Sequence, residues 1–92
     1  MKPVLYPYMT LLDDTEICHS QMLEQHGEQT VEVHFERPID SGFCSARCSL
    51  PKYQWLFNDG FSEQEIQFFT EFLHHNAHLI FKYAQSVGMH CS

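Results

Sequence analysis

The side chains best suited to binding a metal ion lie in the last third of the sequence. Glu71, His74 and His78 follow one another at intervals of three and four residues, a spacing that places them on one face of a helix. Carboxylate and imidazole groups bind zinc, nickel or copper, so this set predicts either a metal-binding protein or a metal-dependent hydrolase. The glutamate of a catalytic HExxH motif is missing. A solvated polar face of a helix explains the same residues, and we expect no metal and no cofactor.

The four cysteines lack the spacing of a metal site or of a disulfide. If residues 43–50 form a strand, Cys44 and Cys48 lie on the same face but about 13 Å apart. That separation is too large for one zinc ion or one disulfide bond. We therefore expect these two side chains to be small and buried. In a reducing compartment Cys18 and Cys91 are expected to be free thiols as well.

A histidine lies between two carboxylates in the segment from residue 30 to residue 37. Glu32, His34 and Glu36 occupy alternate positions, so in a strand they share the outward face while their apolar neighbours point inward. Two nearby carboxylates favour the protonated imidazole, which predicts a pH-sensitive strip; an ordinary exposed face of a sheet is the alternative. No GxSxG motif and no glycine-rich phosphate loop occurs. We expect a protein that is not an enzyme.

Acidic side chains outnumber basic ones. The chain carries a formal net charge of −7, with five Lys and Arg residues against twelve Asp and Glu. These few cations are scattered, whereas binding a phosphate backbone needs clustered ones, so the composition excludes nucleic acid as a partner. We expect an acidic face that attracts a basic protein partner; the alternative is that the charge only keeps the protein soluble. The residues of this expected face are Glu24, Glu28, Glu32 and Glu36.

Residues 62–87 are predicted to form one long helix. Ser62 and Glu65 have the spacing of a capping box, no proline follows, and Gly88 supplies a stop. Apolar residues fill roughly half of the helix circumference, more than the stripe of about 100° that covers a sheet. We expect the surplus flank to be an interface, in a homodimer or with another protein, unless the first strand or the segment around Trp55 covers it. This flank consists of Phe68, Phe72, Leu79 and Tyr83.

The segments before this helix predict an antiparallel sheet. Alternating or β-branched stretches give three or four strands, and Pro7 makes the first an edge strand or a bulged one. Pro51 is expected to start a short helix over residues 51–58. We therefore expect a single α+β domain over residues 1–92, mostly β over 1–50, with the long helix packed on the sheet. The expected strands are 4–12, 16–23, 30–37 and 43–50.

Two segments resemble a family of small uncharacterised bacterial proteins. The stretch Val31-Glu32-Val33-His34-Phe35-Glu36 is similar to the histidine-bearing strand of that family, and Gly60-Phe61-Ser62-x-x-Glu65 is similar to the GFS-x-x-E start of its final helix. Members are often encoded beside a second small protein, in arrangements suggestive of toxin–antitoxin modules. The resemblance implies a protein partner from a neighbouring gene.

The sequence contains no apolar run near the ~20 residues of a membrane span. Residues 1–14 hold two prolines and no signal-peptide core. We therefore expect a cytoplasmic protein without a membrane partner. Its predicted function is that of a small acidic, non-catalytic interaction module that self-associates or binds a basic protein.

Overall fold

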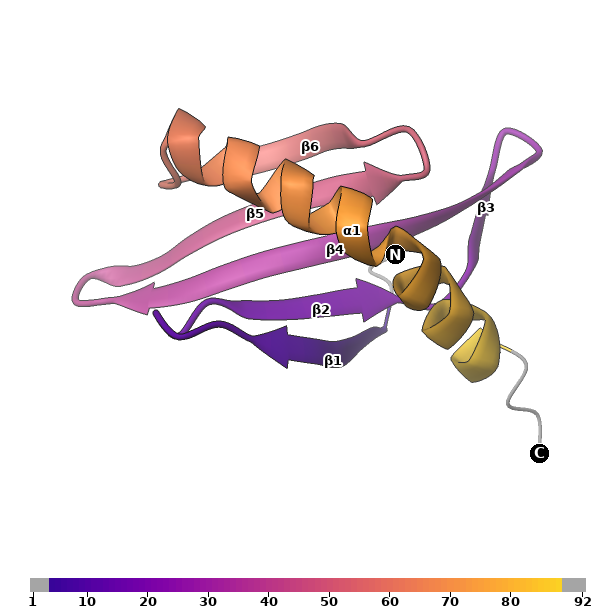
Figure 1. Cartoon of the computed structure of the whole chain (residues 1–92), viewed down its shortest axis with the longest axis horizontal. Helices are drawn as coiled ribbons and strands as arrows, with labels where there is room; N and C mark the ends of the chain where they lie inside the picture. Colours follow the sequence, from indigo (N-terminus) through magenta and orange to yellow (C-terminus); the bar gives the residue numbers. More distant parts are fainter. Residues whose placement is uncertain (1–3, 89–92) are drawn as a thin grey trace.

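The computed structural model of the protein describes residues 4–88, which form six strands followed by one helix (Figure 1). No helix among these residues is long and apolar enough to cross a lipid bilayer. The elements in chain order are β1 (Leu5–Thr10), β2 (Glu16–Ser20), β3 (Leu23–Gln25), β4 (Glu28–Ile39), β5 (Gly42–Leu50), β6 (Gln54–Asp59) and α1 (Glu63–Gly88).

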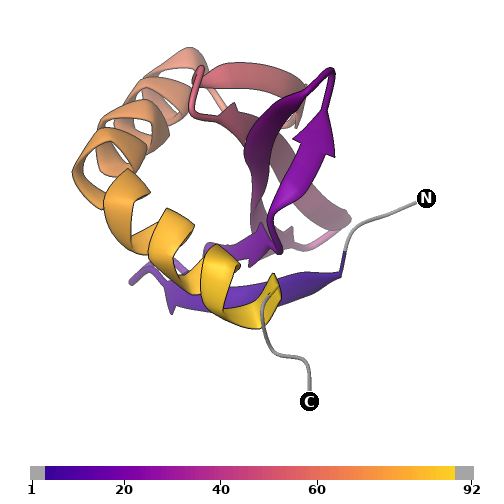
Figure 2. The ribbon, with the colours of Figure 1, turned by 90° about the vertical axis from the view of Figure 1, so that its right-hand side faces the viewer.

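The strands form one antiparallel sheet in the order β1-β2-β4-β5-β6, and β3 pairs with the start of β4. The sheet curves around α1, which crosses one face diagonally (Figure 2). We call the face toward α1 the inner face and the opposite one the outer face. The predicted α+β class and the helix packed on a sheet are confirmed, but the expected number of strands, three or four, was too low.

The predicted short helix over residues 51–58 is wrong. Residues 51–53 form a turn, and β6 then pairs with β5 as the second edge strand of the sheet. Tertiary contacts explain the strand: the Trp55 ring lies 5.6 Å from the ring of Phe35, and its indole N–H donates a hydrogen bond of 3.0 Å to the Thr70 hydroxyl of α1. Contacts with the partner strand and with the helix thus determine the secondary structure of residues 54–59, whose local sequence pattern is ambiguous.

The expected strand over residues 16–23 is divided into β2 and β3. At the end of β2, the Glu32 main-chain N–H donates a hydrogen bond of 3.0 Å to the Ser20 hydroxyl. A side chain thus accepts here in place of a main-chain carbonyl of the neighbouring strand. A two-residue turn at His26 and Gly27 then connects β3 to β4, and both residues have positive φ (54° and 79°). That conformation is typical of tight hairpins.

The core lies between the inner face and α1. Val31, Val33 and Phe35 point inward from β4, as the alternation predicts, and the Phe35 and Phe69 rings stack with centroids 4.4 Å apart. Cys44 and Cys48 are buried on the same face of β5, so their predicted burial is confirmed. The three cysteines among residues 4–88 are free thiols. Cys91 lies outside the described residues.

The start of α1 has the predicted capping box. The Ser62 N–H donates to Glu65 Oε1 over 3.0 Å, and the Glu65 N–H donates to Ser62 Oγ over 3.1 Å. Gly60 precedes the cap with φ of +109°, and a Cβ atom there would lie 2.8 Å from Cys44 Sγ. Only glycine fits this position without strain.

Candidate interaction surfaces

Three carboxylates lie in one row across the outer face. Glu16 of β2 is the register partner of Glu36 in β4, Glu36 is paired with Ser45 of β5, and Ser45 is paired with Asp59 of β6. Their neighbours Ile17 and Phe35 are buried on the inner face, so these side chains project outward. All three carboxylate residues are exposed. We call Glu16, Glu36 and Asp59 the acidic row.

The two carboxylates on neighbouring strands lie directly opposite each other. Burial raises the pKa of the Cys18 thiol, and the negative charges of Glu16 and Glu36 raise it further. Both charges therefore act on the same small area of the outer face. Like charges directly opposite in an antiparallel pair destabilise a sheet, so this arrangement has a cost in the isolated protein.

The next row on the outer face contains Cys18, His34, Arg47 and Phe57 in register. His34 Nε2 lies 3.1 Å from Glu32 Oε1, and the Arg47 guanidinium lies 5.1 Å from the centre of the Phe57 ring. Cysteine, histidine and a carboxylate are the parts of a nucleophilic triad. The pKa of Cys18 is raised by burial and by the charges of Glu16 and Glu36, however, which disfavours the thiolate that a nucleophile needs.

A shallow hollow of about 410 Å³ lies over these two rows. Two exposed apolar side chains belong to its lining, Leu5 from β1 and Phe57 from β6. The polar residues in its lining are His34, Glu36, Ser45 and Arg47. The hollow thus brings two exposed apolar side chains together with a carboxylate, an imidazole and a guanidinium group.

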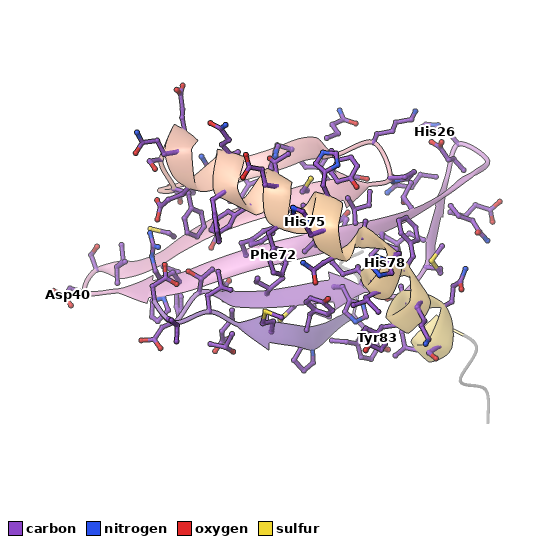
Figure 3. The ribbon with its side chains drawn as sticks, viewed as in Figure 1. His26, Asp40, Phe72, His75, His78 and Tyr83 are labelled. Atoms are coloured by element: carbon purple, nitrogen blue, oxygen red, sulfur yellow. The ribbon has the colours of Figure 1, made fainter. Side chains whose placement is uncertain are left out.

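The predicted acidic face is only partly assembled. Glu32 and Glu36 lie on the outer face as expected, but Glu24 and Glu28 lie in the β3–β4 hairpin, where Glu28 pairs with Lys52 Nζ at 3.3 Å. Figure 3 shows the tip of that hairpin, at His26, at the opposite end of the molecule from Asp40, which follows the end of β4. The sequence analysis did not select Glu16 and Asp59, because only the strand register brings them beside Glu36.

The flank of α1 that was predicted to be an interface faces β1 over part of its length. The Tyr8 ring lies 6.2 Å from Phe72 and 6.1 Å from Tyr83, and the Tyr8 hydroxyl donates to Asn76 Oδ1 over 2.6 Å. Phe72 and Leu79 are half-buried, whereas Phe68 and Tyr83 are 54% and 45% exposed. The first strand therefore covers the middle of this flank, the alternative that the sequence left open (Figure 3).

Phe68 meets the β1–β2 loop at the uncovered end of the flank. It lines a hollow of about 360 Å³ with Leu11, Leu12 and Asp13, and Leu12 is fully exposed. Arg37 holds the loop to the helix, because its guanidinium contacts Asp13 Oδ2 at 2.9 Å and Glu65 Oε2 at 2.6 Å. We call Leu11, Leu12 and Phe68 the Leu12 patch; Leu12 and Phe68 are exposed, and Leu11 is half-buried.

The histidine-rich face of α1 does not form a metal centre. Glu71, His74 and His78 are exposed, and His74 stacks on Tyr53 of the β5–β6 turn with ring centroids 3.9 Å apart. Within residues 4–88, no three His, Cys, Asp or Glu side chains lie close enough together to hold a metal ion. The alternative based on these three residues therefore has no geometric support.

Comparison of the chain with protein-family models, with curated proteins and with solved structures finds no match. The resemblance to a small bacterial family therefore stays a prediction.

Proposed function

We propose that the protein is a non-catalytic interaction module whose outer face binds a basic segment of another protein. One observation carries this proposal: the acidic row lies on a face that none of the described elements covers, with Glu16 and Glu36 as direct cross-strand neighbours. Lys or Arg side chains of a partner would offset the repulsion between these carboxylates. A local arrangement that costs stability is expected at a functional site.

The size of the outer face suits such a partner. Five strands about 4.8 Å apart and between five and twelve residues long give a sheet area on the order of 600 Å². One partner of a standard protein–protein interface contributes about 800 Å². Leu5 and Phe57 add exposed apolar surface beside the charges, and the net charge of −7 speeds the approach of a basic partner.

A matched pair of charge reversals tests this proposal. Glu36→Lys changes the acidic row, whereas Glu71→Lys makes the same change of charge on an exposed site of α1. With a partner recovered from the native host and then purified, we expect Glu36→Lys to slow association at least about tenfold and Glu71→Lys to slow it much less. Raising the salt concentration should slow the wild-type association steeply. Equal effects of the two reversals would refute the outer face as the binding surface.

Self-association through the Leu12 patch is a second candidate. The fully exposed Leu12 side chain and Phe68 line the same hollow, so two copies related by a twofold axis could pack their Leu12 patches against each other. Burying a leucine contributes about 1.5–3 kcal/mol, and two are buried per dimer. Leu12→Glu should therefore weaken a dimer more than 100-fold.

Sedimentation velocity over a range of concentrations measures this effect. Ile39→Glu is the matched control, because Ile39 is also exposed but lies at the β4–β5 hairpin. A wild-type protein that stays monomeric at millimolar concentration, or a Leu12→Glu variant that associates as the wild type does, would exclude this candidate.

A further inference from the structure

A third hollow lies between the first two strands and the C-terminal part of α1. Its volume is about 390 Å³. Three tyrosines and one histidine contribute to its lining: Tyr6 and Tyr8 from β1, His19 from β2 and Tyr83 from α1. Figure 3 shows Tyr83 reaching from the helix toward β1. We call these four residues the aromatic cage; the rest of the lining is Pro7, Ser86 and Val87.

The rings of the cage face in different directions. The centroids of Tyr6 and His19 are 5.8 Å apart at an angle of 32°, and those of Tyr8 and Tyr83 are 6.1 Å apart at 52°. Tyr8 and His19 meet nearly at right angles, at 81° and 6.5 Å. The rings are thus inclined to one another around the hollow rather than stacked in parallel.

Hydrogen bonds hold two of these rings in place before any ligand binds. The Tyr8 hydroxyl donates to Asn76 Oδ1, and Asn76 Nδ2 donates in turn to the Phe72 carbonyl over 2.8 Å. His19 is 97% buried, and its Nδ1 lies 2.8 Å from the Ser20 carbonyl oxygen. A carbonyl oxygen can only accept, so this contact is a hydrogen bond when Nδ1 carries a proton. A cage held in this way loses little entropy when a ligand binds.

The electrostatics of the hollow select the charge of the ligand. Among residues 4–88, no Lys, Arg, Asp or Glu side chain lines it, so these residues offer an anion no counter-charge. The faces of aromatic rings carry negative potential and attract cations within about 6 Å. The net charge of the chain, −7, adds a long-range field of the same sign.

We propose that the aromatic cage binds an alkylated ammonium group. Two sources carry this chemistry, a free quaternary amine of the choline type and a methylated lysine of a protein. An unmethylated ammonium is more strongly hydrated, so removing it from water costs more. This site is separate from the outer face and does not depend on the function proposed for that face.

A pair of ligands of the same shape tests the charge requirement. Choline and its uncharged isostere 3,3-dimethylbutan-1-ol are titrated into the full chain, and the NMR signals of the tyrosine and histidine rings are followed. We expect saturable shifts with choline and binding of the isostere weaker by at least about tenfold, the contribution of cation–π attraction. Equal binding of both compounds, or no saturable shift with choline, would overturn the proposal.

Variants show whether the cage rings are responsible. Tyr83→Leu removes a ring from an exposed position and should weaken choline binding about tenfold or more, while Tyr83→Phe keeps the ring and should bind within about threefold of the wild type. Tyr53→Leu is the control, because Tyr53 stacks on His74 outside the cage. Loss of binding in Tyr53→Leu, or full binding in Tyr83→Leu, would contradict the proposed site.

Peptides distinguish the two sources. A peptide with one trimethyllysine is compared with its unmethylated form and with choline. Tighter binding of the trimethylated peptide than of choline identifies a protein ligand, and the reverse order identifies a free amine. A peptide that binds equally with and without the methyl groups would overturn the proposal.

Discussion

Removing the repulsion within the acidic row should stabilise the protein. Two unit charges about 6 Å apart in water repel by about 0.7 kcal/mol, and physiological salt lowers this to about 0.3–0.5 kcal/mol. Glu16 and Glu36 are direct register partners, a placement in which pairwise energies of about 0.2–1 kcal/mol are typical. We therefore expect Glu16→Gln and Glu36→Gln each to raise the free energy of unfolding, and the double variant to gain less than the sum of the two.

Urea unfolding of the wild type, the two single variants and the double variant measures the coupling energy between Glu16 and Glu36. Trp55 is the single tryptophan of the chain, and it packs on the core and bonds to Thr70, so its fluorescence reports the loss of the fold. The double-mutant cycle cancels the separate effects of each substitution. In 1 M salt the Debye length falls to about 3 Å and the coupling should disappear. Additive effects at low salt, or a coupling that 1 M salt leaves unchanged, would refute the repulsion.

Two more predictions concern single residues. Hydrogen bonds to Thr15 and Arg37 lower the pKa of Asp13, and hydrogen bonds to Ser62 and Arg37 lower the pKa of Glu65. Carboxylates with lowered pKa stabilise the folded state above the ordinary carboxyl pKa of about 4, and this contribution is lost as the pH falls through the lowered values. Arg37→Leu should therefore be less stable than the wild type at pH 7 and lose less stability on acidification; parallel acid titrations would contradict this. Burial raises the pKa of Cys48 to about 12, so alkylation at pH 8, followed by peptide mass spectrometry, should modify Cys48 only after unfolding, and rapid labelling in the folded protein would contradict its burial.

Local sequence signals predicted much of the fold. The alternation in residues 30–37 and 43–50 depends on which side chains can be buried, and it gave the two central strands and their inner faces. The Ser62–Glu65 capping box depends only on neighbouring residues, and it gave the start of α1. Pro51 led to the prediction of a short helix over residues 51–58, but residues 54–59 form a strand. The strand that forms there depends on contacts with Phe35 and Thr70, which no local pattern contains.

The candidate surfaces were harder to predict, because they depend on register. Glu36 was selected from its own strand, but Glu16 is twenty positions earlier and becomes its neighbour only through the β2–β4 pairing. The helix flank was recognised as an apolar strip, and its role as an interface stays a prediction. Whether the flank of α1 is exposed depends on where the Tyr8 ring packs. The sequence around Pro7 does not predict the position of that ring. The exposure of Leu12 likewise follows from the shape of the β1–β2 loop.

Carboxyl-group labelling of the complex tests the central claim most directly. The protein is treated with a carbodiimide and an amine, alone and with a basic protein purified from the native host, and the modified residues are quantified by mass spectrometry. We expect the partner to protect Glu16, Glu36 and Asp59, while Glu71 on α1 reacts as it does in the free protein. A bound partner that leaves the acidic row fully reactive would contradict the proposal that the outer face is the binding surface.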